Sequence, residues 1–215
     1  MATSRENKTI SQFKSALIGG GARNNLFEVE LTTLPAGIPW DSDSFRYMCK
    51  AAQLPAQNVA NIDVPFRGRI FKVAGDRTID TWTVTIINDE SFNLRKAFEQ
   101  WSELIAKLDN NLGATDPSAY MTNAKVFQLG RGSSTSSKSS VGTSNAVLAE
   151  YEFVDIWPSN VAAIDLSYDS SDAIEDFTVE FQVQSFNVVA AGGANGLLNS
   201  HTVKNKSWQN YLGSR

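Results

Sequence analysis

The chain has 215 residues, of which 42% are hydrophobic and 20% charged, a composition typical of a soluble protein with one sizeable domain. Its net charge of −4 argues against a protein that holds nucleic acid through phosphate contacts, because such surfaces are basic. No apolar run reaches the roughly 18 residues that span a bilayer, so no membrane insertion is expected. The N-terminal residues around Arg5 and Lys8 precede only scattered apolar residues, which predicts no secretory signal.

Residues 1–25 are predicted to form an N-terminal arm. Ile10, Phe13 and Leu17 have the spacing of a short amphipathic helix, and glycines follow at positions 19–21. A helix this short is marginal by itself. Its apolar stripe therefore needs a surface to dock on, either its own domain or a neighbouring copy, which makes these three residues a candidate inter-subunit arm.

The first strands are predicted from alternating apolar and polar residues. Residues 27–31 alternate as a half-buried strand, and the proline- and glycine-containing segment 35–44 is a turn-rich connection. A second strand is expected at 45–51, where Phe45, Tyr47 and Cys49 alternate. Cys49 is interpreted as a buried apolar residue rather than a nucleophile because it belongs to this alternating row, and as the only cysteine it cannot form an internal disulfide.

Two strands joined by a tight turn are predicted within residues 66–88. We place the turn at Gly75-Asp76-Arg77, because glycine can adopt a positive φ and aspartate can hydrogen-bond the turning backbone. In the returning strand, threonines alternate with an apolar row that begins at Trp82. That row should face the core.

A helix is predicted at about residues 90–108, directly after this strand. Asn88 and Asp89 offer an N-cap, and Gly113 follows the expected end of the helix. The apolar residues of the segment recur at four-three spacing, so one helical face should cover the core. They are Leu94, Phe98, Trp101, Ile105 and Leu108.

The second half of the chain is predicted to be antiparallel β structure. A short strand at 125–129 precedes residues 130–145, which are so rich in Ser, Gly and Thr that we expect a flexible hairpin loop. A phosphate cradle is the alternative for this loop, but no Gly-Lys-Ser or Gly-Lys-Thr follows it. Apolar and polar residues then alternate over 150–153, 164–168 and 177–184, as in strands with one wet face.

No catalytic, cofactor or metal site is predicted. The sequence has no Gly-x-Ser-x-Gly motif and no Cys/His spacing for zinc, and its only histidine, His201, lies in a polar tail. The carboxylates around Asp172 belong to a turn region, where such groups are usually solvated. A monomeric β-sandwich that binds a ligand remains open as an alternative, because strand periodicity alone does not distinguish it.

Four stretches of the chain resemble a known family in the order in which the family has them: 20–30, 49–56, 72–90 and 156–161. Together they resemble the tail tube proteins of contractile-tailed, T-even-like bacteriophages, over roughly residues 20 to 187. The residues that carry the signature turn and core of this resemblance are Gly75, Asp76, Arg77, Trp82, Phe98, Trp101, Trp157 and Pro158.

The strand patterns predict a mainly β fold, an antiparallel sandwich or barrel-like domain of about eight strands with one flanking helix. The resemblance implies hexameric rings with a shared inner β-barrel, stacked into the inner tube of a contractile tail in the virion. The implied partners are the sheath outside, the baseplate, tape-measure and tail terminator proteins, and double-stranded DNA that passes without specific binding. A tube from a pyocin-like or type VI secretion-like machine is the alternative within this class.

Simple geometry agrees with a DNA conduit. If six copies each contribute four strands, as the resemblance implies, about 24 strands at ~4.8 Å spacing give a barrel of roughly 37 Å backbone diameter. Side chains on both walls leave an opening on the order of 20 to 25 Å, about the width of a DNA duplex.

From the extent of the resemblance, we divide the chain into the arm, a tail-tube domain at 26–187 and a C-terminal extension at 188–215.

Charge is uneven along the chain, because no Lys or Arg lies between Lys138 and Lys204. The simpler interpretation of this acidic stretch is a solvated face. A tube that conducts DNA favours another, since acidic walls repel the phosphates that basic walls would hold. The candidate lumen-facing residues are Glu150, Glu152, Asp165, Asp169 and Glu180.

Overall fold

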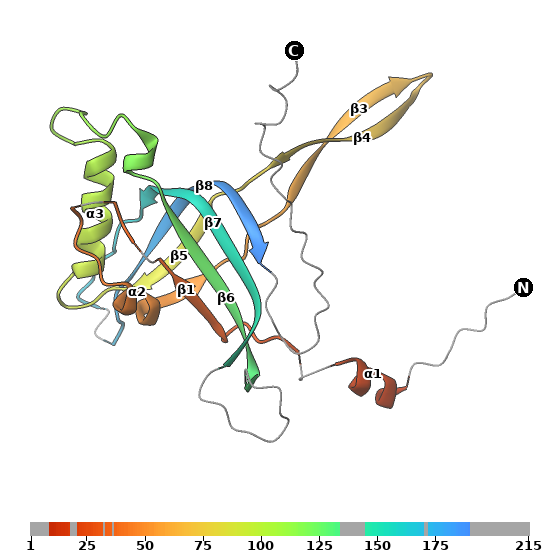
Figure 1. Cartoon of the computed structure of the whole chain (residues 1–215), viewed down its shortest axis with the longest axis horizontal. Coiled ribbons are helices and arrows are strands. Elements are labelled where there is room, and N and C mark those ends of the chain that lie inside the picture. Colours follow the sequence, from red (N-terminus) through yellow and green to blue (C-terminus); the bar gives the residue numbers. More distant parts are fainter. Residues whose placement is uncertain are drawn as a thin grey trace, which may run out of the picture.

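Six antiparallel strands form the body of the protein in a computed structural model that describes residues 9–17, 21–31, 33–35, 37–133, 145–169 and 172–189. The sheet has the order β1-β6-β7-β8-β5-β2 and curves into a nearly closed barrel (Figure 1). Its strands are β1 (Phe27–Glu30), β2 (Cys49–Ala52), β5 (Trp82–Ile87), β6 (Thr122–Ser133), β7 (Asn145–Val161) and β8 (Asp176–Val189).

The remaining elements lie around this barrel. A separate two-stranded sheet, β3 (Asn58–Phe66) with β4 (Arg69–Thr78), projects from it, and α3 (Asn93–Ile105) packs on one side (Figure 1). The shorter helices are α1 (Ile10–Ala16), α2 (Ser42–Met48) and the 3-10 turn η2 (Pro117–Ala119). The mainly β, barrel-like fold with antiparallel strands is confirmed. In the described part of the chain, no helix is long and apolar enough to cross a membrane.

The alternation predicted for β5 is confirmed and continues into the neighbouring strand. Trp82 is buried and pairs directly with Phe181 of β8. The next two buried pairs along this ladder are Val84–Val179 and Ile86–Phe177. Side chains that are directly opposite in an antiparallel ladder share a face, so these pairs form the centre of the barrel core.

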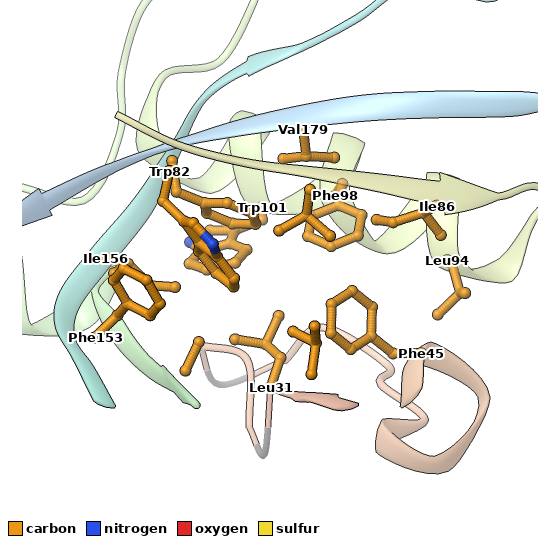
Figure 2. Close-up of a cluster of buried hydrophobic side chains, with 14 of the residues drawn as sticks. Leu31, Phe45, Trp82, Ile86, Leu94, Phe98, Trp101, Phe153, Ile156 and Val179 are labelled. Carbon is orange, nitrogen blue, oxygen red and sulfur yellow. The ribbon is translucent and has the colours of Figure 1, made fainter. Parts of the chain in front are cut away.

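Helix α3 closes the core from the side. Leu94, Phe98 and Trp101 are buried, as their spacing predicts, and Figure 2 shows them pointing toward the apolar row of β5. The Trp101 Nε1–H donates to the carbonyl of Tyr120 at 2.7 Å, so its polar atom is satisfied while the ring is buried.

The boundaries of α3 differ from the prediction. The helix begins at Asn93, after Phe92 in a left-handed conformation with φ 55°, and Asn88 does not cap it. Asn88 instead donates to the side chain of Glu175 at 3.0 Å, which connects this segment to the start of β8. The helix ends at Ile105, so Leu108 lies beyond it and is exposed rather than part of the apolar face.

The predicted turn at Gly75-Asp76-Arg77 is wrong. All three residues lie inside β4, and the turn is at Arg67 and Gly68, whose φ values of 45° and 80° suit a two-residue hairpin. The glycine at 75 is explained by a close approach. A Cβ there would lie 3.2 Å from the carbonyl oxygen of Ala60, where the register of the two strands shifts.

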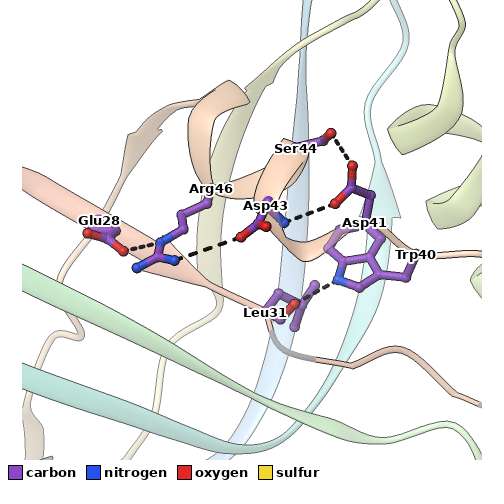
Figure 3. A network of polar contacts seen from close by, with 7 residues as sticks. All are labelled: Glu28, Leu31, Trp40, Asp41, Asp43, Ser44 and Arg46. Atoms are coloured by element: carbon purple, nitrogen blue, oxygen red, sulfur yellow. Dashed lines mark hydrogen bonds and ion pairs between the residues drawn. The ribbon is translucent and has the colours of Figure 1, made fainter.

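The strand predicted at 45–51 is half wrong. Residues 42–48 form helix α2, capped by Asp41, whose side chain accepts from the backbone N–H of Asp43 at 3.1 Å (Figure 3). Only Phe45 of this helix is buried, and the strand β2 begins at Cys49. The predicted alternation therefore fails, because Tyr47 is exposed and Cys49 lies beyond the helix.

Other boundaries also change. The strand expected at 125–129 is the middle of the longer β6, and the loop expected at 130–145 is shorter, because Ser133 pairs with Asn145. Residues 164–168 form no strand, since β7 ends at Val161. The inner part of the Ser-rich loop and the C-terminal residues 190–215, with His201, lie outside the described residues.

Trp82 is the side chain whose removal we expect to lower the free energy of unfolding most. It stacks on Phe153 with ring centroids 4.4 Å apart and donates from Nε1 to the carbonyl of Gln53 at 2.9 Å. Trp82→Ala should lower the free energy of unfolding by about 3 to 5 kcal/mol, measured by denaturant titration, because it leaves a large cavity. Tyr47→Ala, at a largely exposed position, should change it by less than about 0.5 kcal/mol. Equal losses in both variants would contradict this assignment of the core.

Candidate functional site

The β3–β4 hairpin exposes a large set of apolar side chains. They are between 41% and 68% exposed, although strands of this composition normally cover a core. The cross-strand pairs Ile62–Val73 and Val64–Phe71 place four of them on one face. A lone two-stranded hairpin is marginal in water, and such a patch usually marks a contact surface. The full set is Val59, Ile62, Val64, Phe66, Ile70, Phe71 and Val73.

The N-terminal arm exposes a second apolar stripe. The predicted helix is confirmed as α1, with a complete capping box between Thr9 and Gln12. Ile10, Phe13 and Leu17 are 76%, 64% and 45% exposed, and Figure 1 shows α1 well separated from the barrel. The stripe therefore does not dock on its own domain. A neighbouring copy is the alternative that this placement favours.

A third surface is the outer face of the sheet, opposite the core. The register aligns Glu30, Lys125 and Glu152 across β1, β6 and β7, and it aligns Glu28 and Glu150 on either side of Phe127. Because directly paired residues share a face, these groups form one acidic field with one lysine at its centre. We call Glu28, Glu30, Lys125, Glu150 and Glu152 the acidic wall.

The charges of the acidic wall interact. The Lys125 Nζ lies 3.0 Å from a carboxylate oxygen of Glu150, and this hydrogen bond, with the charges of Glu150, Glu152 and Glu30, raises the pKa of Lys125. Arg46 of α2 pairs in the same way with Glu28, which raises the pKa of Arg46 (Figure 3). Two of the four carboxylates thus have a cationic partner, and the field remains negative.

The predicted lumen-facing acids are only partly brought together. Glu150 and Glu152 belong to the acidic wall, and Glu180 lies farther along the outer face, between buried Val179 and Phe181. Asp165 and Asp169 lie instead in the exposed connection between β7 and β8. Glu28 and Glu30 were missed by the prediction, although their alternation with buried neighbours in the first strand was a usable signal.

The signature residues are divided between core and hairpin. Trp82, Phe98, Trp101 and Pro158 are buried in the barrel, and Trp157 packs at its edge, with its ring edge-on to that of Tyr120. Gly75, Asp76 and Arg77 lie in β4, where the Arg77 guanidinium donates to the side chain of Gln57 at 3.4 Å. None of these arrangements is a catalytic constellation.

The chemistry-bearing groups are not arranged for catalysis or metal binding within the described residues. Burial raises the pKa of the Cys49 thiol to about 12, so almost no thiolate exists near neutral pH. In the same part of the chain, no three His, Cys, Asp or Glu side chains gather as a metal site would require. The exposed apolar surfaces and the acidic wall are therefore the features to explain.

The comparison with known families bears on the ligand-binding alternative. The family described as phage tail tube protein matches residues 22–189, most of the chain. The chain belongs to this family. A monomeric ligand-binding sandwich is thereby set aside, and the exposed surfaces are those of a tail tube protein.

Individual relatives agree with this membership. The tail tube protein of Enterobacteria phage T4 is 37% identical over 161 residues, which cover 75% of this chain and 88% of the relative. The tail tube protein of Serratia phage KSP90 is 22% identical over 81% of this chain and 93% of its own length. The tube-terminating cap of the anti-feeding prophage has the same fold, with a TM-score of 0.51, 14% identity and coverage of 88% of this chain and 99% of the cap.

Cys49 offers a test of the non-catalytic interpretation. The folded protein should react with iodoacetamide at pH 8 at least about a hundredfold more slowly than the protein unfolded in urea, because raising the pKa from 9.0 to about 12 removes the reactive thiolate. The rates can be followed by mass spectrometry. Equal rates in the two states would show a reactive thiol and reopen the question of a nucleophile.

Proposed function

We propose that this chain assembles into hexameric rings that stack as the inner tube of a contractile tail, the conduit for the genome. The observation that carries the proposal is the apolar surface of the β3–β4 hairpin and of α1, on a chain whose barrel already has a complete core. Contact between copies would remove this apolar surface from water, which favours association. A tube built of one repeated chain provides such contacts at every subunit.

A shared inner barrel is compatible with the sheet. Its two edge strands, β1 and β2, have only four residues each, whereas β6, β7 and β8 have 12, 17 and 14. Where a long strand extends past a shorter edge strand, its backbone N–H and C=O groups have no neighbouring strand to pair with. A strand from a neighbouring copy can form hydrogen bonds with these groups. Six copies joined in this way would close a ring without free edges.

The acidic wall is the surface that we assign to the lumen. It lies on the face of the sheet that the core does not use, and its net charge is negative even after the Lys125 and Arg46 pairs are counted. Phosphates passing such a wall are repelled rather than bound, so DNA can slide along many rings. Glu180, on the same outer face, would extend the negative field.

The partners follow from the same proposal. We assign the sheath to the outside of the tube and the baseplate, tape-measure and terminator proteins to its ends, in line with the family resemblance. Two fold neighbours support the end partners, a tube-terminating cap and a protein of the anti-feeding prophage baseplate assembly with a TM-score of 0.52. The relatives that reach 37% identity are phage proteins, which favours a genome conduit over a DNA-free injection machine.

The first experiment is negative-stain electron microscopy of the purified full-length protein and of a variant lacking residues 1–18. The full-length protein should form long hollow tubes. If Ile10, Phe13 and Leu17 dock on a neighbouring copy, the shortened variant should remain a folded monomer by circular dichroism and size-exclusion chromatography and should not polymerise. Unchanged tubes would remove the arm from the assembly mechanism, and a monomeric full-length protein would overturn the proposed function.

The second experiment concerns the lumen charge. Phage particles carrying Glu152→Lys and Glu180→Lys should assemble normally but eject DNA about tenfold more slowly at low salt, because each new cation attracts phosphate in every subunit. High salt should restore much of the rate, since screening acts over about 8 Å at physiological ionic strength. Ejection can be timed by dye fluorescence. Glu90→Lys, at an exposed turn outside the sheet, is the matched control. Equal slowing in the control would refute the assignment.

A further inference from the structure

The connection between β7 and β8 forms an open groove that the assignments above do not use. It is lined by residues 162–169 and 173–178, and we call it the acidic groove. Three of its apolar side chains, Leu166, Tyr168 and Ile174, are among the most exposed in the described structure. Acidic residues alternate with them, at Asp165 and Asp169. The groove therefore presents apolar and negative groups side by side.

The groove retains most of its negative charge. Lys50 pairs with Asp176, and the Arg95 guanidinium donates to the carbonyl of Ala162 at 2.6 Å, so these nearby cations are already engaged. Asp165 and Asp169 form no ion pair with any described residue. A docking partner with exposed positive charge would meet uncompensated carboxylates here.

The groove is also held in place by the barrel. The backbone N–H of Asn88 donates to the carbonyl of Glu175 at 2.9 Å, and its side chain donates to the Glu175 carboxylate at 3.0 Å. Asn88 is only 8% exposed, and its Oδ1 accepts no hydrogen bond from the described residues. Glu175, which lines the groove, is thus fixed next to a buried acceptor that remains unused.

The tip of the β3–β4 hairpin has the complementary composition. Arg67 in the turn and Arg69 just after it lie between exposed Phe66 and Ile70, and the Arg67 guanidinium lies 5.4 Å from the centre of the Phe66 ring. Neither arginine forms an ion pair within the described part of the chain. The tip therefore presents apolar and positive groups side by side, the counterpart of the acidic groove.

The two surfaces lie on opposite sides of the molecule. Figure 1 shows the hairpin projecting beyond one side of the barrel, whereas the β7–β8 connection lies on the other side, next to α3. The tip of one copy therefore does not meet the groove of the same copy. A contact between two different patches repeats head to tail from copy to copy, and it builds either a closed ring or an open filament.

We propose that the hairpin tip of one copy docks in the acidic groove of a second copy of this chain, with Arg67 and Arg69 facing Asp165, Asp169 and Glu175. This inference rests on the proposed function and names two surfaces through which copies of the chain bind one another in the tube. Apolar residues on both sides supply the buried area, and the opposite charges set the register. The occupant of the groove is a second copy of this chain.

The test reverses the charges of the hairpin tip in one variant, those of the acidic groove in a second and both sets in a third. The hairpin variant is Arg67→Asp with Arg69→Glu, where aspartate is chosen because residue 67 has φ 45°, which aspartate tolerates. The groove variant is Asp165→Lys with Asp169→Lys. Lys107→Glu, an exposed reversal in the loop after α3, is the control. All changes are at exposed positions, and thermal unfolding of the unassembled subunit verifies that each variant is folded.

Polymerisation is measured by sedimentation and electron microscopy over a range of protein concentrations. Each one-sided reversal should raise the concentration needed for tubes by roughly tenfold at low salt, and the combined variant should restore it to near the wild-type value. The control should have no effect. Normal tubes from either one-sided variant, or no rescue in the combined variant, would overturn the inference while wild-type tubes still support the proposed function. Absence of wild-type tubes would overturn the function itself.

Discussion

The packing of Phe98 against the barrel is the interaction on which the rest of the structure depends. The centroid of its ring lies 5.6 to 6.3 Å from those of five other aromatic rings, which belong to Trp40, Phe45, Trp101, Phe177 and Phe181. These rings come from α3, β8, α2 and the segment before α2. One side chain thus holds together elements that are far apart in the sequence and fixes α3 on the open side of the sheet.

A complete core of this kind changes the meaning of the remaining apolar surface. The hairpin and α1 add nothing to the interior, so their exposed side chains are a cost to the isolated subunit. The outer face of the sheet is different, because its carboxylates are arranged in register and only partly neutralised. The fold therefore keeps three sets of side chains apart: the buried core, the exposed apolar residues of the projections and the charged residues of the outer face.

Patterns that depend on neighbours in sequence were predictable, and contacts between distant segments were not. The alternation after Trp82 and the spacing of Leu94, Phe98 and Trp101 identified a strand and a helix, because burial imposes periods of 2.0 and 3.6 residues. Gly75 misled the prediction, since a glycine that allows close approach looks the same in sequence as one that allows a turn. The residues 45–48 misled it because a single buried position in a short helix has no period.

The candidate surfaces show the same limit. Glu150 and Glu152 could be identified as a row on one strand, but their alignment with Lys125 and Glu30 depends on a register that the sequence does not reveal. Register within β7 is itself irregular. Asp155 has φ 54°, and this left-handed residue lets Phe153 and Ile156, three positions apart, both face the core. A strict period of two fails at such a residue.

The hairpin projects from only one side of the subunit, and this gives any filament of such subunits a direction. In the contact proposed above, each added copy covers the hairpin of the copy before it or brings its own hairpin to an open groove, so the two ends of a filament are chemically different. One end then presents uncovered apolar hairpins, and the other presents empty grooves. Growth can then start from one kind of end and be stopped at the other by a protein that imitates only half of the contact.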